Sequence, residues 1–191
     1  MIHLKQKYTY ATLITCGRLL CVVPVISAIA IQQWTMAFCF FIFAAATDGI
    51  DGFVARRFNE CTFFGAALDA CVDKIMIVST LFSLVIFNHA TFAIPFWFLV
   101  AISIKEIAQL MGAIYIYFYI HHFEIKPLLL GKCTMALYVI LITVFLYMYI
   151  KKIPFYGVQY CCAFVAFVAY ASFYQYFIVA YCYINEYQNR K

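Results

Sequence analysis

Apolar residues fill most of this chain, and short polar segments interrupt them at regular intervals. Apolar stretches of about eighteen residues or more predict membrane-spanning helices, whereas a β-barrel would show alternating segments of about ten residues. The pattern therefore predicts an all-α integral membrane protein with six transmembrane helices, which form a single domain over residues 1–191. We expect these helices at about residues 12–31, 34–57, 63–87, 91–120, 127–150 and 156–184.

The composition supports the same class of protein. Hydrophobic residues make up 68% of the chain and charged residues 11%, against about 45–50% and about 25% in soluble domains. A soluble fold could not cover so much apolar surface, so we expect membrane lipids, and not nucleic acid, around it. The nine cysteines include no Cys-x-x-Cys pair and are expected to act as small packing residues. The many tyrosines and phenylalanines are expected to face lipid.

The positions of lysine and arginine predict the orientation, because cytoplasmic loops retain these residues. If the N-terminus is cytoplasmic, Lys151 and Lys152 are the basic residues at the opposite face. We therefore expect a multi-pass protein with both termini in the cytoplasm, in a bacterial inner membrane or an equivalent one. The basic residues on the cytoplasmic side are then Lys5, Lys7, Arg56, Arg57, Lys126, Lys132, Arg190 and Lys191.

Four aspartates interrupt the apolar pattern at the cytoplasmic edge of the second and third expected helices. Asp48 and Asp51 are spaced i, i+3, and Asp69 and Asp73 are spaced i, i+4, so each pair lies on one helical face. They are half of the eight acidic residues in the chain. An acid within a membrane span costs about 2.5–3.5 kcal/mol or more, which makes this window the first candidate for a functional site.

Carboxylates gathered this closely indicate bound cations, because like charges repel strongly where the dielectric constant is low. Oxygen-only ligands select hard ions such as Mg²⁺ or Mn²⁺, and two ions about 4 Å apart are suited to phosphoryl transfer. Arg56 can supply a bidentate fork for a phosphate, while Gly52 and Gly65 leave room for a large ligand. Helix packing is the simpler role for the neighbouring Ala66 and Ala67.

The same window resembles the signature of the CDP-alcohol phosphotransferases, the class I CDP-alcohol phosphatidyltransferase family. The resemblance extends over nearly the whole chain, since that family is also built of six membrane helices. All eight signature residues are present without a gap, in the order Asp48-x2-Asp51-Gly52-x2-Ala55-Arg56-x8-Gly65-x3-Asp69-x3-Asp73.

The resemblance implies an enzyme that transfers a phosphatidyl or similar group from a CDP-linked lipid to the hydroxyl of a polar alcohol, with release of CMP. It implies that two ions, Mg²⁺ or Mn²⁺, are held by Asp48, Asp51, Asp69 and Asp73. Asp73 would also take the proton from the attacking hydroxyl. The expected contacts to the CDP group are Asp48, Gly52, Ala55, Arg56 and Gly65.

Further features resemble phosphatidylglycerophosphate synthases, among them the segments Arg56-Arg57-Phe58 and Gly131-Lys132-Cys133-Thr134. This resemblance implies CDP-diacylglycerol as donor, glycerol 3-phosphate as acceptor, and a homodimer. Cardiolipin synthases and phosphatidylinositol-type synthases remain alternatives within the family. Lys105 and Lys132 are candidates for the phosphate of the acceptor. A structural ion pair of Lys105 and Glu106 with other helices competes for Lys105, and a snorkelling position at the interface competes for Lys132.

A second class of function is a small divalent-cation transporter or channel, because acids within a membrane could line an ion pathway. Such a pathway would distribute its acids across the depth of the membrane. The four aspartates instead cluster at one edge, beside glycines and an arginine. This placement favours the phosphatidyltransferase.

Overall fold

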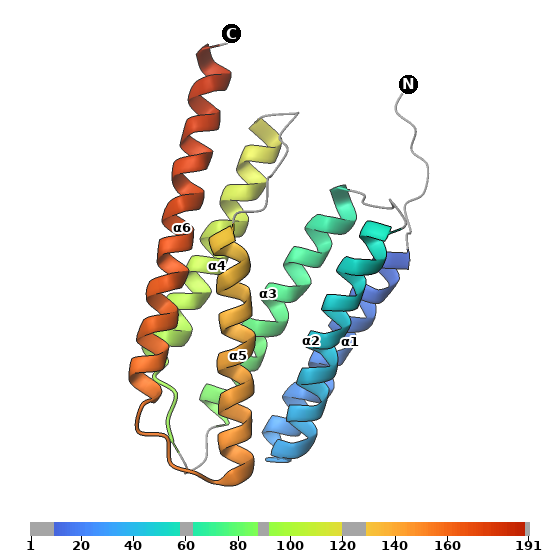
Figure 1. The fold of residues 1–191 in the computed structure, drawn as a ribbon, viewed down its shortest axis with the longest axis vertical. Helices are drawn as coiled ribbons and strands as arrows, with labels where there is room; N and C mark the ends of the chain where they lie inside the picture. Colours follow the sequence, from blue (N-terminus) through green and yellow to red (C-terminus); the bar gives the residue numbers. More distant parts are fainter. Residues whose placement is uncertain (1–9, 58–62, 88–91, 120–128, 190–191) are drawn as a thin grey trace. The chain divides into compact units, whose positions relative to one another are not determined.

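The computed structural model describes the backbone of residues 10–57, 63–87, 92–119 and 129–189, without the side chains of residues 48–57 and 63–70 and of several residues near the helix ends. The described chain is all-helical, with six helices that match the six expected segments in order (Figure 1). These helices are α1 (Tyr10–Ala30), α2 (Trp34–Arg57), α3 (Phe63–Ile86), α4 (Phe96–Tyr119), α5 (Leu129–Lys151) and α6 (Val158–Asn189).

Two helix boundaries differ from the expectation. α4 begins at Phe96, not at residue 91, because Pro95 disfavours the helical conformation at Ile94 before it. Its first turn closes where the Phe98 N–H donates to the Pro95 carbonyl at 3.0 Å. α6 continues to Asn189, beyond the expected end at residue 184. Polar residues end an apolar span, but they do not end a helix when no proline or glycine follows.

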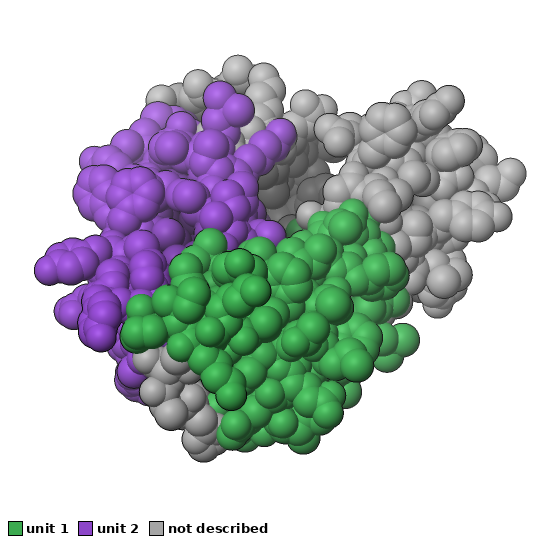
Figure 2. Space-filling view, turned by 60° about the horizontal axis from the view of Figure 1, so that its bottom comes forward, with its two compact units in different colours: residues 1–91, 142–154 green, residues 92–141, 155–191 purple. Residues whose placement is uncertain are grey.

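The helices divide into two compact units, which Figure 2 shows in different colours. Unit 1 comprises Met1–Thr91 with Ile142–Pro154, and unit 2 comprises Phe92–Leu141 with Phe155–Lys191. α5 therefore contributes its first half to unit 2 and its second half to unit 1. Each unit is described separately below.

In unit 1, α1 packs against both α2 and α3. Ala28 on α1 and Ala37 and Ala44 on α2 are all buried, and such small side chains allow two helix backbones to approach closely. The larger side chains Phe41 and Leu84 are fully buried and fill the remaining space. Close packing of this kind holds helices together when the surrounding medium is itself apolar.

In unit 2, α4 packs against α6. Phe98 and Ile102 of α4 and Cys162 and Ala169 of α6 are completely buried. The Tyr170 hydroxyl of α6 donates to the Ala101 carbonyl of α4 at 3.1 Å, which ties the two helices together. Cys162 thus has the expected packing role. It is, however, the one buried residue among the seven described cysteines, all of them free: Cys21, Cys39, Cys71, Cys133, Cys161, Cys162 and Cys182.

Three segments within the described residues are long and apolar enough to cross a membrane, and their outer surfaces carry large apolar side chains. Phe164 and Phe167 of α6, for example, are 60% and 74% exposed. The expected class, a helical membrane protein, agrees with these segments, while the number of six spans stays a prediction. The three candidate spans are Phe96–Ile114, Leu129–Lys151 and Val158–Cys182, and shorter apolar helical segments cover Leu20–Ala30 and Trp34–Thr47.

Gly112 of α4 faces Tyr176 of α6 and offers a test of this packing. A Cβ atom at Gly112 would lie 3.5 Å from the Tyr176 ring, which is an ordinary contact. Gly112→Ala should therefore leave the free energy of unfolding unchanged or raise it by up to about 1 kcal/mol, since alanine favours a helix over glycine. Thermal unfolding in detergent measures this change. A destabilisation by Gly112→Ala as large as that of the bulkier Gly112→Leu would contradict the packing described here.

Candidate functional site

The helices α2 and α3 carry the four aspartates. Asp48 and Asp51 lie in the C-terminal half of α2, and Asp69 and Asp73 lie in the N-terminal half of α3. Figure 1 shows these two helix ends at the same end of unit 1. At about 1.5 Å per residue, Asp48 lies about 14 Å before the end of α2, and Asp73 about 15 Å after the start of α3. The acids are thus at comparable depths on two helices of one unit.

Asp73 is the aspartate of this set whose side chain the structure describes, and it is half-buried. The side chains of Asp48, Asp51 and Asp69, and of the signature residue Arg56, lie outside the described part. Among the described residues, no group of three or more His, Cys, Asp or Glu side chains could hold a metal ion. The expected metal set therefore stays a prediction, as does the expected CDP site at Gly52, Ala55, Arg56 and Gly65.

Beyond Asp73, the hydroxyl groups of α3 are satisfied within the helix itself. The Thr80 hydroxyl donates to the Met76 carbonyl at 2.7 Å, and the Ser83 hydroxyl donates to the Ser79 carbonyl at 2.8 Å. Thr80 and Ser83 are both buried, and such bonds remove the cost of burying a polar group. The rest of α3 is therefore a packing surface, and its candidate chemistry lies in its N-terminal half.

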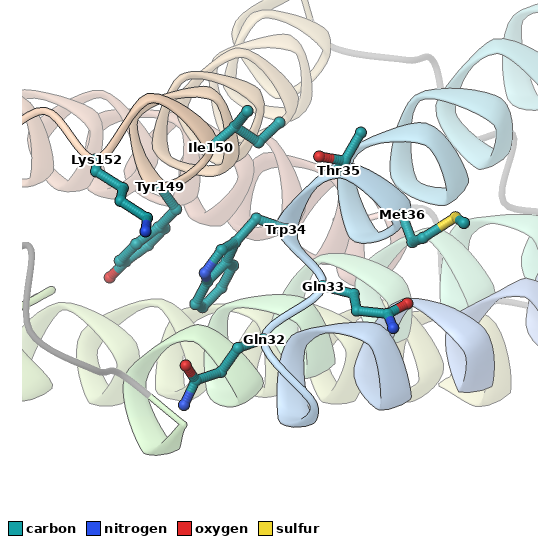
Figure 3. A pocket seen from close by; sticks show the side chains of 8 residues that line it. All are labelled: Gln32, Gln33, Trp34, Thr35, Met36, Tyr149, Ile150 and Lys152. Carbon is teal, nitrogen blue, oxygen red and sulfur yellow. The ribbon is translucent and has the colours of Figure 1, made fainter.

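A pocket of about 370 Å³ lies at the opposite end of α2 in unit 1 (Figure 3). One wall is the Trp34 ring, which stacks on the Tyr149 ring at 4.5 Å between centroids and 14° between planes. No feature of the sequence marks this pocket, because Tyr149 is one of sixteen tyrosines in the chain and nothing near it in the sequence indicates that it stacks on Trp34. The pocket is lined by Gln32, Gln33, Trp34, Thr35, Met36, Tyr149, Ile150 and Lys152.

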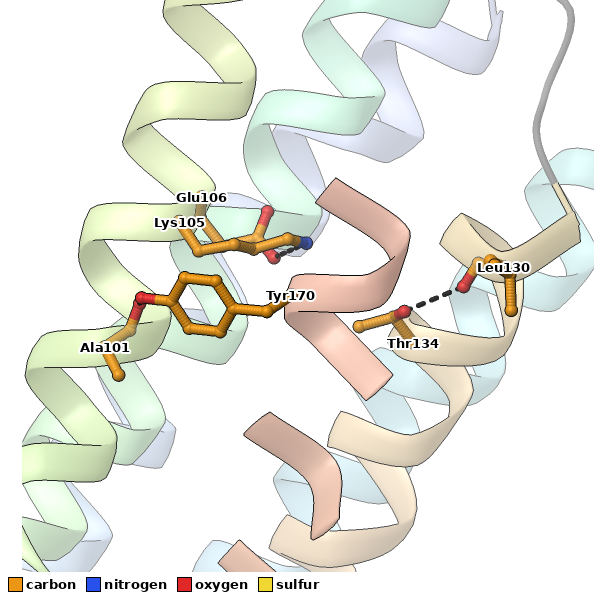
Figure 4. Close-up of polar contacts among 6 residues, drawn as sticks. All are labelled: Ala101, Lys105, Glu106, Leu130, Thr134 and Tyr170. Atoms are coloured by element: carbon orange, nitrogen blue, oxygen red, sulfur yellow. Dashed lines mark hydrogen bonds and ion pairs between the residues drawn. The ribbon is translucent and has the colours of Figure 1, made fainter. Parts of the chain in front are cut away.

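In unit 2, Lys105 and Glu106 form a buried ion pair on α4 (Figure 4). The Lys105 ammonium lies 2.7 Å from Glu106 Oε1, and each residue is 3% exposed. The same ammonium lies 5.9 Å from the centre of the buried Tyr138 ring. The pair is buried, but it joins two neighbours on α4, whereas the expected ion pair was with other helices. A contact of Lys105 with the acceptor phosphate stays a prediction.

Lys132 differs from Lys105 because it is exposed, in the first turn of α5. The adjacent Gly131 faces Ser172 of α6, with 3.9 Å between the site of a Cβ atom and the Ser172 hydroxyl. The buried Thr134 hydroxyl donates to the Leu130 carbonyl at 2.7 Å (Figure 4). The two roles considered for Lys132, a contact with the acceptor phosphate and a position at the membrane interface, both stay predictions.

Several aromatic residues correct the expectation that such side chains face lipid. Tyr138 and Tyr149 are each 1% exposed, and Phe145 is fully buried. The expectation is correct for Tyr174 and Tyr181 of α6, which are 67% and 60% exposed. Aromatic rings suit lipid and a packed core equally well, so composition alone does not separate the two locations.

Comparison with known proteins gives matches of two kinds. The family model for CDP-alcohol phosphatidyltransferase matches residues 8–173. Three bacterial relatives, each named CDP-diacylglycerol–glycerol-3-phosphate 3-phosphatidyltransferase, match shorter segments. The protein from Yersinia enterocolitica is 50% identical over 50 residues, which cover 25% of this chain and 28% of the relative.

The relative from Pectobacterium atrosepticum is 42% identical over 59 residues, which cover 30% of this chain and 32% of the relative. The one from Wigglesworthia glossinidia brevipalpis is 39% identical over 71 residues, which cover 37% and 36%. The chain thus matches about a third of the length of these curated relatives, whereas the family model matches most of the chain. On the family match and the eight signature residues of α2 and α3, the chain belongs to the CDP-alcohol phosphatidyltransferase family.

Proposed function

We propose that this protein transfers the phosphatidyl group of CDP-diacylglycerol to glycerol 3-phosphate, giving phosphatidylglycerophosphate and CMP. The observation that carries the proposal is the complete eight-residue signature on α2 and α3, at one end of unit 1. The choice of acceptor is supported by the names of the three relatives. We also propose that the site and both termini face the cytoplasm and that the protein is a homodimer.

The donor lipid carries a pyrophosphate, and the signature residues suit its recognition. Arg56 offers a planar pair of N–H donors that fits a phosphate group. Gly52, Ala55 and Gly65 have small side chains or none, which allows a large ligand to approach the backbone closely. Because the signature residues of α2 and α3 stand at one end of unit 1, one nucleotide could be held between the two helices.

The acids fit a pair of divalent ions by their donor chemistry, since carboxylate oxygens are the ligands that Mg²⁺ and Mn²⁺ prefer. The residues that would hold such ions are Asp48, Asp51, Asp69 and Asp73. When bound, the ions would neutralise negative charge on the pyrophosphate. The chain also supplies Arg56, whose positive charge acts in the same direction.

Asp73 is the proposed base, because it is the last acid of the signature and lies at the half-buried surface of α3. Its carboxylate would take the proton from the acceptor hydroxyl as that oxygen bonds to the phosphorus of the phosphatidyl group. The bond from this phosphorus to the oxygen of CMP breaks, and CMP leaves. Lys105 and Lys132 are the proposed cations for the acceptor phosphate, and of the two Lys132 is exposed.

An assay of CMP release tests this function. Purified protein with CDP-diacylglycerol, glycerol 3-phosphate and Mg²⁺ or Mn²⁺ should release CMP and form phosphatidylglycerophosphate. Removal of divalent ions with EDTA should abolish release, and excess Mg²⁺ or Mn²⁺ should restore it. The aspartates and the pyrophosphate are all negatively charged, so they repel one another unless divalent ions lie between them.

The acceptor is tested by replacing glycerol 3-phosphate with phosphatidylglycerol, inositol, inositol phosphate or serine. Faster CMP release with any of these would transfer the assignment to another member of the family. An absence of release with every acceptor, together with Mg²⁺ flux in proteoliposomes, would replace the enzyme with a cation transporter.

A further inference from the structure

Two unusual helix ends meet at the pocket beside Trp34 and Tyr149 in unit 1 (Figure 3). α1 ends with the Gln32 N–H donating to the Ile29 carbonyl at 3.0 Å, next to a Gln33 N–H bond to the Ala28 carbonyl at 2.9 Å. This pair of bonds is the Schellman arrangement, whose turning residue has a left-handed backbone. Gln32 is that residue, with φ of 60°.

α5 ends in the same way. The Lys152 N–H donates to the Tyr149 carbonyl and the Ile153 N–H to the Met148 carbonyl, both at 3.2 Å. Lys152 is the turning residue, with φ of 53°. Glycine adopts this backbone at the least conformational cost, and a long side chain adopts it less readily. Both turns nevertheless place a long polar side chain, Gln32 or Lys152, at one pocket.

The lining of this pocket combines hydrogen-bond donors, one positive charge and an aromatic wall. Lys152 contributes an ammonium group, and the exposed Gln32 and Gln33 contribute amide groups. None of the eight described residues that line the pocket is acidic. The stacked Trp34 and Tyr149 rings keep one wall rigid, since Tyr149 is 1% exposed. A pocket with this lining is suited to an anion that also has an apolar part.

The position of the pocket indicates where such an anion would come from. The candidate span Leu129–Lys151 ends beside it, and tryptophan and tyrosine concentrate where a membrane meets water. Trp34, in the pocket wall, precedes Asp48 by fourteen residues on α2, which separates the pocket from the acids by about 21 Å. The pocket and the acids thus lie at opposite ends of the apolar helical segment Trp34–Thr47 of α2.

We propose that this pocket binds the phosphodiester headgroup of an anionic phospholipid in the leaflet opposite the acidic site. Lys152 binds the phosphate, Gln32 and Gln33 donate hydrogen bonds to it or to the headgroup, and Trp34 and Ile150 contact the glycerol region. The volume of about 370 Å³ is within the range of small-ligand sites, about 300–1,000 Å³. The proposal is independent of the transfer reaction and needs no activity to test it.

Tryptophan fluorescence provides the measurement, because Trp34 and Trp97 are the two tryptophans of the chain. A Trp97→Phe background leaves Trp34 as the reporter in the pocket wall. The full-length protein is placed in phosphatidylcholine vesicles, and brominated phosphatidylglycerol is titrated against brominated phosphatidylcholine. We expect Trp34 quenching to favour phosphatidylglycerol about fivefold, the preference that one lysine near a membrane surface provides.

Lys152→Gly should reduce this preference to about that of a neutral surface. Glycine fits the left-handed backbone, so the α5 end keeps its conformation. Lys151→Ala is the matched control. It removes the same charge one residue away, where the Lys151 ammonium lies 5.9 Å from the centre of the Tyr147 ring and does not line the pocket.

Retained preference in Lys151→Ala together with its loss in Lys152→Gly supports the site. An equal loss in both variants would show only general surface attraction and would overturn the site. Equal quenching by both lipids in the unaltered pocket would show no preference for an anionic headgroup and would also overturn it. Displacement of the lipid by excess inorganic phosphate would overturn the lipid assignment in favour of a free anion.

Discussion

Replacing Asp73 with asparagine should slow CMP release by at least about a hundredfold, the lower bound for losing a general base. Asparagine has nearly the same shape as aspartate but cannot accept the proton of the acceptor hydroxyl, and it contributes no negative charge to a metal site. Asp73 is half-buried and lies in the N-terminal half of α3, the half of the helix whose sequence also contains Asp69. The rate of CMP release at saturating CDP-diacylglycerol and glycerol 3-phosphate gives the measurement.

Glu186→Gln provides the control for this change. It also neutralises one carboxylate, but Glu186 lies in the last turn of α6, outside the signature. We expect Glu186→Gln to keep activity within about twofold of the original protein, because Glu186 is not one of the signature residues. If Asp73→Asn retained more than about a tenth of the rate, the role of Asp73 as base would be wrong, whatever the family of the chain.

Breaking the Lys105–Glu106 pair should lower the free energy of unfolding by about 3–5 kcal/mol, the usual cost of removing one member of a buried ion pair. The pair is 2.7 Å apart with both residues 3% exposed, so water cannot replace a missing partner easily. Lys105→Met and Glu106→Gln should each show this loss. Denaturant unfolding in detergent, followed by circular dichroism, measures it.

The double variant Lys105→Met, Glu106→Met tests whether the loss of stability in the single variants comes from removing only one of the two charges. Replacing both charges by apolar side chains of similar size is often neutral, so the double variant should recover to within about 1 kcal/mol of the original protein. Lys132→Met, at an exposed lysine, should change stability by less than about 0.5 kcal/mol. A double variant less stable than either single variant would contradict the ion-pair explanation.

The same double variant also tests the proposed acceptor contact. If Lys105 binds the acceptor phosphate, a stable double variant should have a raised KM for glycerol 3-phosphate with an unchanged KM for CDP-diacylglycerol. If Lys105 is only structural, both KM values should be unchanged once stability is restored. Lys132→Met, measured in parallel, reports whether the exposed lysine serves this phosphate.

Local features of the chain were predictable from the sequence. The six helices occur where long apolar stretches were found, and the turns at Gln32 and Lys152 fall where polar residues interrupt them. The boundary at Phe96 was missed, although Pro95 offered a signal for it. Helix formation depends on neighbours three and four residues away, so a linear pattern contains most of the information that it needs.

The candidate acidic site also follows from the sequence, because the spacing of Asp48, Asp51, Asp69 and Asp73 specifies helical faces before any packing is known. By itself, then, the sequence determined the helices, the family signature and the residues to test for catalysis. Only the tertiary structure decided which apolar side chains are core. Tyr138 and Tyr149 are buried while Tyr160 is 81% exposed, because in an apolar solvent burial depends on shape and contact, and not on hydrophobicity. The pocket at Gln32 and Lys152 became visible only in three dimensions, because two helix ends that are distant in the sequence form it.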